Sequence, residues 1–269
     1  MPDTVSPALR ADDGTLRTRP SGGTSNRRAP VGAWGHYGGV YSERAGRVAG
    51  MTVWTRVYGG GAYRVLPDGC MDLIWHDGGL LIAGPDTVAH VEDDRPGSTY
   101  AGLRFAPGTG PLLLGAPARE VRDQRVPLDA LWPSAEARRL AERAEQAPAA
   151  ALEAWAVDRV RSAGRVGPAR GAALTRTIAA ELDAGRSVGE VAASTGLGER
   201  QLRRRCEAAF GYGPKTLARV LRLQRALALA RAGTPFAEVA VRAGYADQPH
   251  LAREVRALTG VALGELLAP

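Results

Sequence analysis

The feature that most constrains the fold is a pattern that occurs twice near the end of the chain. Residues 187–211 read SVGEVAASTGLGERQLRRRCEAAFG, and residues 235–260 read PFAEVAVRAGYADQPHLAREVRALTG. Each copy has Glu-Val-Ala, then a glycine, an apolar residue, and a polar stretch around a leucine that ends at another glycine. A helix, a tight turn and a second helix is the plan of a helix-turn-helix unit, and two copies are far more specific than one. The sequence therefore predicts an all-α C-terminal domain with two such units.

Capping residues mark the helix boundaries in this region. Ser187 and Glu190 form a capping box at the start of one helix, and Gly196 suits a left-handed C-cap at its end. Pro214 begins a longer helix that ends near Gly233. At about 1.5 Å per residue, this helix is about 28 Å long. Two helices held apart by such a rod can enter successive major grooves, which lie about 34 Å apart on one face of DNA.

The arginines of the stretch ERQLRRRC in the first copy lie on different sides of the predicted helix. Leu202 and Cys206 share its apolar stripe, since successive residues are about 100° apart. The polar positions that face outward or flank the stripe are Arg200, Gln201, Arg203, Arg204 and Arg205. A solvated face would more often mix Arg with Glu at i,i+4 spacing. We therefore expect the outward positions to read DNA and the flanking ones, Arg203 and Arg205, to contact phosphates.

The second copy repeats this arrangement. Leu251, Val255 and Leu258 form its apolar stripe, and Pro249, His250 and Arg253 point outward. Arg253 thus takes the position that Arg204 has in the first copy. For His250 the alternative is a helix-cap or core histidine, but its outward position favours a DNA contact.

The second copy also resembles the signature of a known family. The stretch EVAVRAGYADQPHLAREVRALTG is similar to the C-terminal signature of the arabinose-regulator (AraC/XylS) family of bacterial transcription regulators. The matching positions are Ala240, Gly244, Tyr245, Asp247, His250, Leu251, Arg253, Arg256 and Gly260. The resemblance covers about residues 171–268. It implies a sequence-specific DNA-binding regulator, with activation as the usual outcome.

The resemblance and the helical positions together select the candidate DNA-binding residues. They are Arg200, Gln201, Arg203, Arg204, Gln248, Pro249, His250, Arg253 and Arg256. The chain departs from the family pattern at Leu251, Val255 and Cys206, where phenylalanines are usual. These smaller residues belong to the apolar stripe, so they affect packing and not the outward face.

Charge supports a polyanionic partner for the C-terminal part. The chain carries a net charge of +7. Residues 168–269 hold 15 Arg or Lys against 9 Asp or Glu, a net of +6, and residues 1–167 hold 20 against 19. The excess positive charge is therefore concentrated in the predicted helix-turn-helix domain, as expected for binding to DNA.

The preceding residues predict an α+β chain of several parts. Residues 1–30 contain few large apolar residues and are expected to be a disordered tail. Residues 31–115 contain short alternating strands, with a hairpin turn at Asp77-Gly78-Gly79, and predict a small barrel- or sandwich-like domain for sensing or oligomerisation. Residues 116–167 predict a helical connector, with Ser134 as an N-cap, and a hinge begins at Arg165. Residues 168–269 are the predicted DNA-binding domain.

The candidate effector-binding residues are Cys70, Asp72 and Trp75, all on one predicted strand. Metal binding by Cys70, Asp72, His76 and His90 is not expected, because nothing in the sequence brings His90 to the others. An alternative function is a cysteine-based DNA alkyl acceptor, or a metal- or thiol-responsive protein, that uses Cys70. The chain has no HExxH motif, and we expect neither an enzyme nor a cofactor.

The expected partners follow from this interpretation. They are double-stranded DNA, RNA polymerase, a small-molecule effector and a second copy of the chain. No apolar run approaches the roughly 20 residues that span a bilayer, and residues 1–30 contain no apolar signal-peptide core. We therefore expect no membrane association and a cytoplasmic, nucleoid-associated protein.

Overall fold

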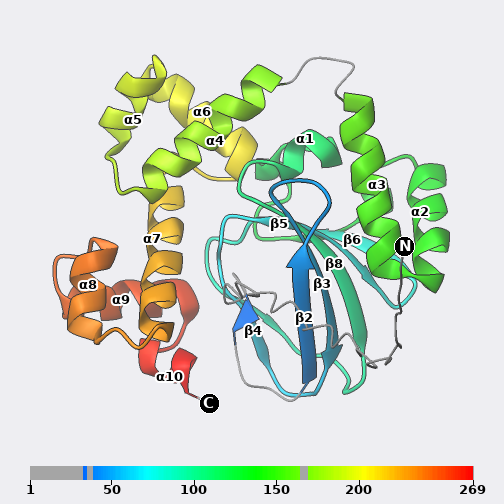
Figure 1. Ribbon diagram of the computed structural model, residues 1–269, viewed down its shortest axis with the longest axis horizontal. Helices are drawn as coiled ribbons and strands as arrows, with labels where there is room; N and C mark the ends of the chain where they lie inside the picture. Colours follow the sequence, from blue (N-terminus) through cyan, green and yellow to red (C-terminus); the bar gives the residue numbers. More distant parts are fainter. Residues whose placement is uncertain (1–32, 35–38, 164–168, 269) are drawn as a thin grey trace, which may run out of the picture.

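The computed structural model describes residues 33–34, 39–163 and 169–268. It has two parts, which lie side by side in Figure 1. We call residues 33–163 the sheet domain and residues 169–268 the helical domain. The predicted tail over residues 1–30 and the start of the predicted hinge at Arg165 lie outside the described residues. Among the residues described, no helix combines the length and apolar character needed to cross a membrane.

Two antiparallel sheets form the framework of the sheet domain, as the prediction of a β-rich N-terminal domain requires. The larger has the strand order β2-β3-β8-β5-β6-β9. Its strands are β2 (Gly39–Ala45), β3 (Met51–Tyr58), β5 (Met71–His76), β6 (Gly79–Ala83), β8 (Thr99–Phe105) and β9 (Arg125–Pro127). The smaller sheet consists of β1 (Ala33–Trp34), β4 (Tyr63–Val65) and β7 (His90–Glu92), in the order β1-β4-β7. The predicted hairpin turn is present between β5 and β6, where Asp77 and Gly78 both have positive φ, 47° and 76°.

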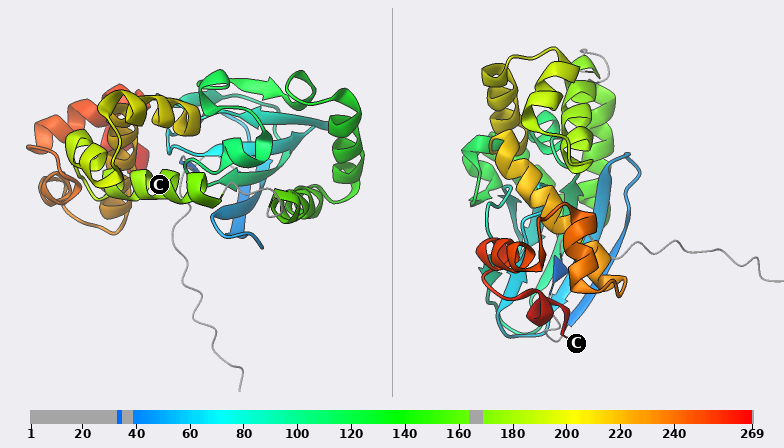
Figure 2. Two further views of the ribbon diagram at one scale, coloured as in Figure 1. Left: turned by 90° about the horizontal axis from the view of Figure 1, so that it is seen from above. Right: turned by 90° about the vertical axis from the view of Figure 1, so that its left-hand side faces the viewer.

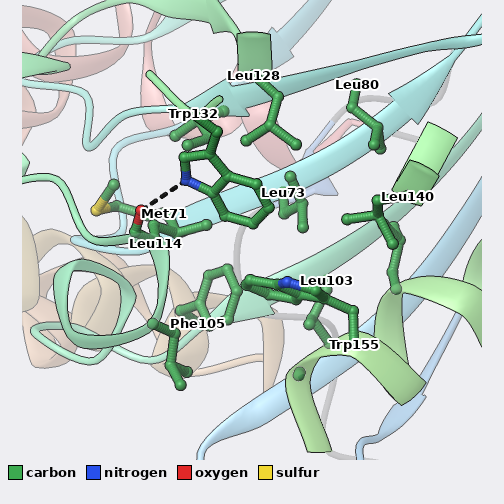
Figure 3. Close-up of a cluster of buried hydrophobic side chains, with 14 of the residues drawn as sticks. Met71, Leu73, Leu80, Leu103, Phe105, Leu114, Leu128, Trp132, Leu140 and Trp155 are labelled. Atoms are coloured by element: carbon green, nitrogen blue, oxygen red, sulfur yellow. Dashed lines mark hydrogen bonds between the residues drawn. The ribbon is translucent and has the colours of Figure 1, made fainter. Parts of the chain in front are cut away.

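The larger sheet buries one face under helices. Alternating residues of its strands, such as Leu73 and Leu103, pack with Trp132 and Trp155 in one hydrophobic core, shown in Figure 3. The covering helices are α1 (Gly110–Leu114), α2 (Ser134–Gln146) and α3 (Pro148–Ala163). Trp132 satisfies its indole N–H inside this core by donating to the Leu114 carbonyl at 2.8 Å.

The described part of the predicted connector, residues 116–163, is therefore more than a connector. Its strand β9 pairs with β6, and two short 3₁₀ turns, η1 (Ala118–Glu120) and η2 (Leu128–Ala130), precede the helices. The prediction missed β9 because three residues are too short to show alternation. The predicted N-cap is also one residue late, since Pro133 precedes α2 and Ser134 is its first residue.

The helical domain contains two groups of three helices, and both groups pack against one long helix between them. The helices are α4 (Ala169–Asp183), α5 (Val188–Thr195), α6 (Glu199–Phe210), α7 (Pro214–Arg231), α8 (Phe236–Ala243), α9 (Gln248–Thr259) and α10 (Leu263–Leu267). The predicted capping box is present, since the Ser187 amide donates to Glu190 at 2.7 Å and the Glu190 amide donates to the Ser187 hydroxyl at 3.3 Å. Gly196 is left-handed with φ 66°, as predicted. Asp247 caps α9 by accepting from the His250 amide at 2.6 Å.

The two domains are in direct contact through several loops. Leu66, which follows β4, is buried in the core of the second helix-turn-helix unit. The Gln224 amide group of α7 donates to the Pro67 carbonyl at 2.7 Å. The Ala89 amide donates to the carbonyl of Leu258, near the end of α9, at 2.7 Å. The sheet domain therefore touches both the rod α7 and the second helix of the second unit.

Candidate nucleic-acid interface

Helix α6 separates its apolar and polar side chains as the sequence predicts. Leu202, Cys206 and Phe210 are fully buried in the core of the first unit. The candidate DNA-binding side chains of this helix, Arg200, Gln201, Arg203 and Arg204, are all exposed. The position of each exposed side chain therefore follows from the burial of the Leu202 stripe.

The polar side chains of α6 differ in what they contact. The Gln201 carbonyl oxygen accepts from the Gly198 amide at 3.1 Å and so completes the N-terminal cap. Arg203 pairs with Glu207 one turn later at 2.8 Å. Arg205, expected at a phosphate, instead donates to the Gly171 carbonyl of α4 at 3.3 Å and is half-buried. This contact with α4 was not expected, because the position 300° around the helix does not by itself show which other helix lies there.

Helix α9 has the same division. Leu251, Val255 and Leu258 are buried. The exposed candidates of this helix are Gln248, Pro249, Arg253 and Arg256. His250 is only half-exposed, and its Nδ1 accepts from the Ala246 amide at 3.2 Å. His250 therefore has the helix-cap role that the sequence left as the alternative.

Four guanidinium groups on these two helices are free to meet a partner. These groups make no hydrogen bond or ion pair with any other residue in the described part of the chain. They belong to Arg200 and Arg204 of α6 and to Arg253 and Arg256 of α9. Exposed arginines that are not neutralised by neighbouring carboxylates favour binding to phosphates and to guanine edges.

The two helices lie on one side of the rod that joins them. In the right-hand view of Figure 2, α6 (olive) and α9 (red) are both to the left of α7. The rod has 18 residues, or about 27 Å at ~1.5 Å per residue. Glu254 of α9 fixes α9 on the rod by accepting from Arg219 at 2.9 and 3.2 Å. Sequence reasoning missed this pair because its partners are 35 positions apart and no local pattern links them.

Comparison with family models identifies this part of the chain. Residues 179–268 match the model of a helix-turn-helix domain, and residues 51–127 match a domain of unknown function (DUF6597). Residues 179–268 are an AraC-type helix-turn-helix domain. The protein is a DNA-binding transcription regulator, and its nucleic-acid partner is double-stranded DNA.

Solved structures also match. A probable AraC family transcriptional regulator from Rhodopseudomonas palustris is 26% identical, with a TM-score of 0.31 over 35% of this chain and 94% of that chain. An apo form of ToxT from Vibrio cholerae is 10% identical, with a TM-score of 0.44 over 82% of this chain and 100% of that one. ToxT bound to an unsaturated fatty acid is 9% identical, with a TM-score of 0.42 over 81% and 94%. No curated protein matches the chain.

The sheet domain has a partly open cavity of about 80 Å³ between its two sheets. The lining includes Tyr41, Trp54, Tyr63, Asp72, Tyr100 and Arg104. Trp54, Asp72 and Arg104 alternate with hydrophobic core residues along their strands, so they lie on the opposite face of the larger sheet. Tyr63 comes from β4 of the smaller sheet. The sequence signal for this face was the set of positions that alternate with the apolar residues in β3 and β8. The prediction used only the apolar positions of this pattern.

An ion cluster lies at one side of the cavity. Arg104 is within 3.3 Å of Asp72 and 3.7 Å of Asp68. Asp72 also accepts from the Trp54 indole N–H at 2.6 Å. Burial alone would lower the pKa of Arg104, but the two carboxylates raise it well above its ordinary value. Arg104 therefore stays charged, and the hydrogen bonds that Asp72 accepts from Trp54 and Arg104 fix the cavity wall.

The three predicted effector residues are not together. Asp72 lines the cavity. Cys70 is buried beside Asp68, and burial together with that carboxylate raises the pKa of its thiol well above the ordinary range. Trp75 points to the opposite face of the sheet, where it packs against the hydrophobic core. The prediction grouped Trp75 with the others by sequence distance, although one residue along a strand reverses the side chain.

The described histidines of the sheet domain lie beside carboxylates, and His76 is 3.3 Å from Asp94 and 3.6 Å from Asp77. His90 lies 3.0 Å from Glu92 on β7, and His76 stacks on Tyr100 at 4.0 Å between ring centroids. Over residues 39–163 and 169–268, no group of three or more His, Cys, Asp or Glu side chains is arranged to hold a metal ion.

Proposed function

We propose that this regulator binds two adjacent major grooves on one face of its operator, with α6 in one groove and α9 in the other. The observation that carries the proposal is that α6 and α9 lie on one side of a rod about 27 Å long and that each exposes arginines. Phosphate contacts supply much of the affinity, and side chains at base edges supply the specificity.

Within α6, we propose that Arg200, Gln201 and Arg204 reach base edges, and that Arg203 contacts a phosphate in exchange for Glu207. Within α9, the same roles fall to Gln248, Pro249 and Arg253, with Arg256 at a phosphate. His250 contributes mainly by capping the helix that presents Arg253, because its Nδ1 is already bonded to the Ala246 amide.

The proposal is tested with duplexes that the full-length protein selects from a random library. Arg204→Ala and Arg253→Ala should each cost about 1–3 kcal/mol of binding free energy and relax the preference at one base pair. Arg139→Ala, which removes an exposed arginine from α2, is the matched control. Wild-type affinity and specificity in both reading variants, or no selected motif at all, would refute the proposal.

We further infer that the sheet domain controls DNA binding through a small effector or through dimerisation. The loop from Leu66 to Cys70 supports an effector route, because it reaches both the cavity and the rod. Asp68 of this loop pairs with Arg104 at the cavity, and the Pro67 carbonyl accepts from Gln224 of α7. A small polar molecule that competes for Arg104 would therefore act on the loop that contacts the rod.

The cavity holds only a small molecule in its present shape, since its volume is about 80 Å³, and Asp72 and Arg104 in its wall offer polar contacts. A thermal-shift screen of small polar metabolites against wild type and Asp72→Asn tests this part. Ligands that raise the melting temperature of both proteins equally would place the effector outside the cavity.

The remaining expectations belong to the same proposal: a non-enzymatic activator that acts on RNA polymerase in the bacterial cytoplasm. The alternative use of Cys70 as an alkyl acceptor is not favoured, because nucleophilic chemistry needs a thiolate and burial disfavours that form here.

A further inference from the structure

The sheet domain meets the reading helix α6 at its C-terminal end. Figure 2 shows this end of α6 directed toward the sheet domain. A side chain at Gly211, the C-cap of α6, would touch the carbonyl of Ala118 in η1. The Arg122 guanidinium donates to the Gly211 carbonyl at 3.4 Å. The segment from η1 to residue 123 therefore lies across the end of α6.

A groove runs along each side of α6, and each contains one arginine of the sheet domain. The first groove, of about 960 Å³, is lined by Arg119 together with Gln201, Arg204 and Arg205. The second groove, of about 510 Å³, is lined by Arg122 together with Arg203 and Lys215. The Arg119 side chain is 51% exposed and that of Arg122 is 48% exposed. Both can therefore reach a partner that enters the grooves.

The positive charge in these grooves is complementary to the phosphates that flank a protein helix bound in the major groove of DNA. A helix in the major groove, which is about 12 Å wide, has a phosphate backbone on either side. The first groove has three arginines against one carboxylate, Glu207. In the second, Arg122, Arg203 and Lys215 face the carboxylates of Glu199 and Glu207.

The present partners of the two sheet-domain arginines are weak. Arg119 lies 3.5 Å from Glu120, and Arg122 lies 3.6 Å from Asp123, both at exposed positions. Surface ion pairs of this kind contribute little to stability and are screened by salt. Exchange of either carboxylate for a phosphate therefore costs little.

The sheet domain could either contact DNA beside α6 or cover α6 and prevent it from binding DNA. The exposure of α6 decides between these two possibilities. The first part of the helix, from Glu199 to Arg204, is open to solvent apart from Leu202. Partial burial begins at Arg205 and increases toward the contact with η1. The reading positions are thus free to enter a groove while η1 lies where the backbone of the DNA leaves it.

We propose that Arg119 and Arg122 bind phosphates on the two sides of α6, so that the DNA interface spans both domains. This inference rests on the proposed function, because it requires α6 in a major groove. It assigns the sheet domain a direct part in affinity, beyond any sensing of an effector. Sequence preference stays with the helical domain, because phosphates carry no base identity.

The test compares Arg119→Ala/Arg122→Ala with Arg138→Ala/Arg139→Ala, which removes two exposed arginines from α2 in the same domain. The probes are a duplex selected by the full-length wild type and an arbitrary duplex of equal length. We expect the first variant to bind both duplexes about tenfold more weakly and the salt dependence, d log K/d log[salt], to become shallower by about 2. Arg119→Lys/Arg122→Lys should retain most of the affinity.

Equal affinity in the alanine variant and the α2 control would overturn the inference, and so would tighter binding, which would mean that η1 shields α6. Unchanged melting temperatures exclude a folding defect. Arg204→Ala distinguishes failure of the two-domain interface from failure of the proposed function. If Arg204→Ala loses specificity while Arg119→Ala/Arg122→Ala binds normally, only the two-domain interface is refuted. If both bind as wild type, the proposed function fails as well.

Discussion

Leu66 offers the most direct test of the contact between the two domains. It belongs to the sheet domain, yet its side chain is 1% exposed and packs with the core of the second helix-turn-helix unit, which includes Leu223, Leu227 and Leu258. Full burial of a leucine contributes about 1.5–3 kcal/mol, and Leu→Ala in a core costs about 2–5 kcal/mol. Because two domains can close part of the space by a small shift, we expect Leu66→Ala to cost about 3 kcal/mol.

This loss acts on the docking of the domains and not on the fold of either one. A change of 3 kcal/mol is roughly a 100-fold change in the ratio of docked to undocked molecules. The Ala89 amide reports that ratio, because it donates across the interface to the Leu258 carbonyl at 2.7 Å. Hydrogen exchange at Ala89 should therefore be up to roughly 100-fold faster in Leu66→Ala.

A matched variant controls for the substitution itself. Leu140 is equally buried, at 1% exposed, but lies in the core of the sheet domain beneath α2. Leu140→Ala should lower the melting temperature of the sheet domain and leave docking intact. If exchange at Ala89 is the same in Leu66→Ala as in wild type, or rises as much in Leu140→Ala, then Leu66 does not hold the domains together.

Three further predictions concern single sites in the sheet domain and the cysteines. Two hydrogen bonds from Arg44, partly offset by burial, lower the pKa of Glu153 from 4.5 to about 2. The stabilisation of the fold by the ionised Glu153 carboxylate is thus present above about pH 4.5 and is lost as the pH falls toward 2. Glu153→Gln should therefore cost about 2 kcal/mol of stability at pH 7, and its stability in urea melts should depend less on pH below 4.5. A Cβ at Gly102 would overlap the Trp54 indole, so Gly102→Ala should cost about 1–3 kcal/mol in the same melts, and an unchanged midpoint would contradict the packing. Burial raises the pKa of Cys206 to about 12 and that of Cys70 well above its ordinary value, so neither thiol should react with iodoacetamide at pH 8 until urea unfolds the chain, as read by intact mass.

The sequence could predict the elements whose causes are local. The Ser187 capping box, the turn at Gly196 and the buried stripe through Leu202 depend on neighbours within a few residues, and all three are confirmed. It could not predict contacts between distant segments. Arg205 was expected at a phosphate, but its partner, the Gly171 carbonyl, is 34 positions away. The spacing of about 100° per residue gives the direction of a side chain relative to its own helix, but it cannot show which other helix lies in that direction.

The same limit applies to the spacing of the two reading helices, which a long α7 alone does not fix. Arg219 holds Glu254 of α9 on the rod, and the sheet domain adds further ties at both ends. Leu66 and the Ala89 amide hold the second unit, and Arg122 holds the C-terminal end of α6. The distance between α6 and α9 is thus a property of both domains together. A change at Leu66 should therefore weaken binding to a two-groove operator more than binding to a single half-site, because only the former needs both helices in register.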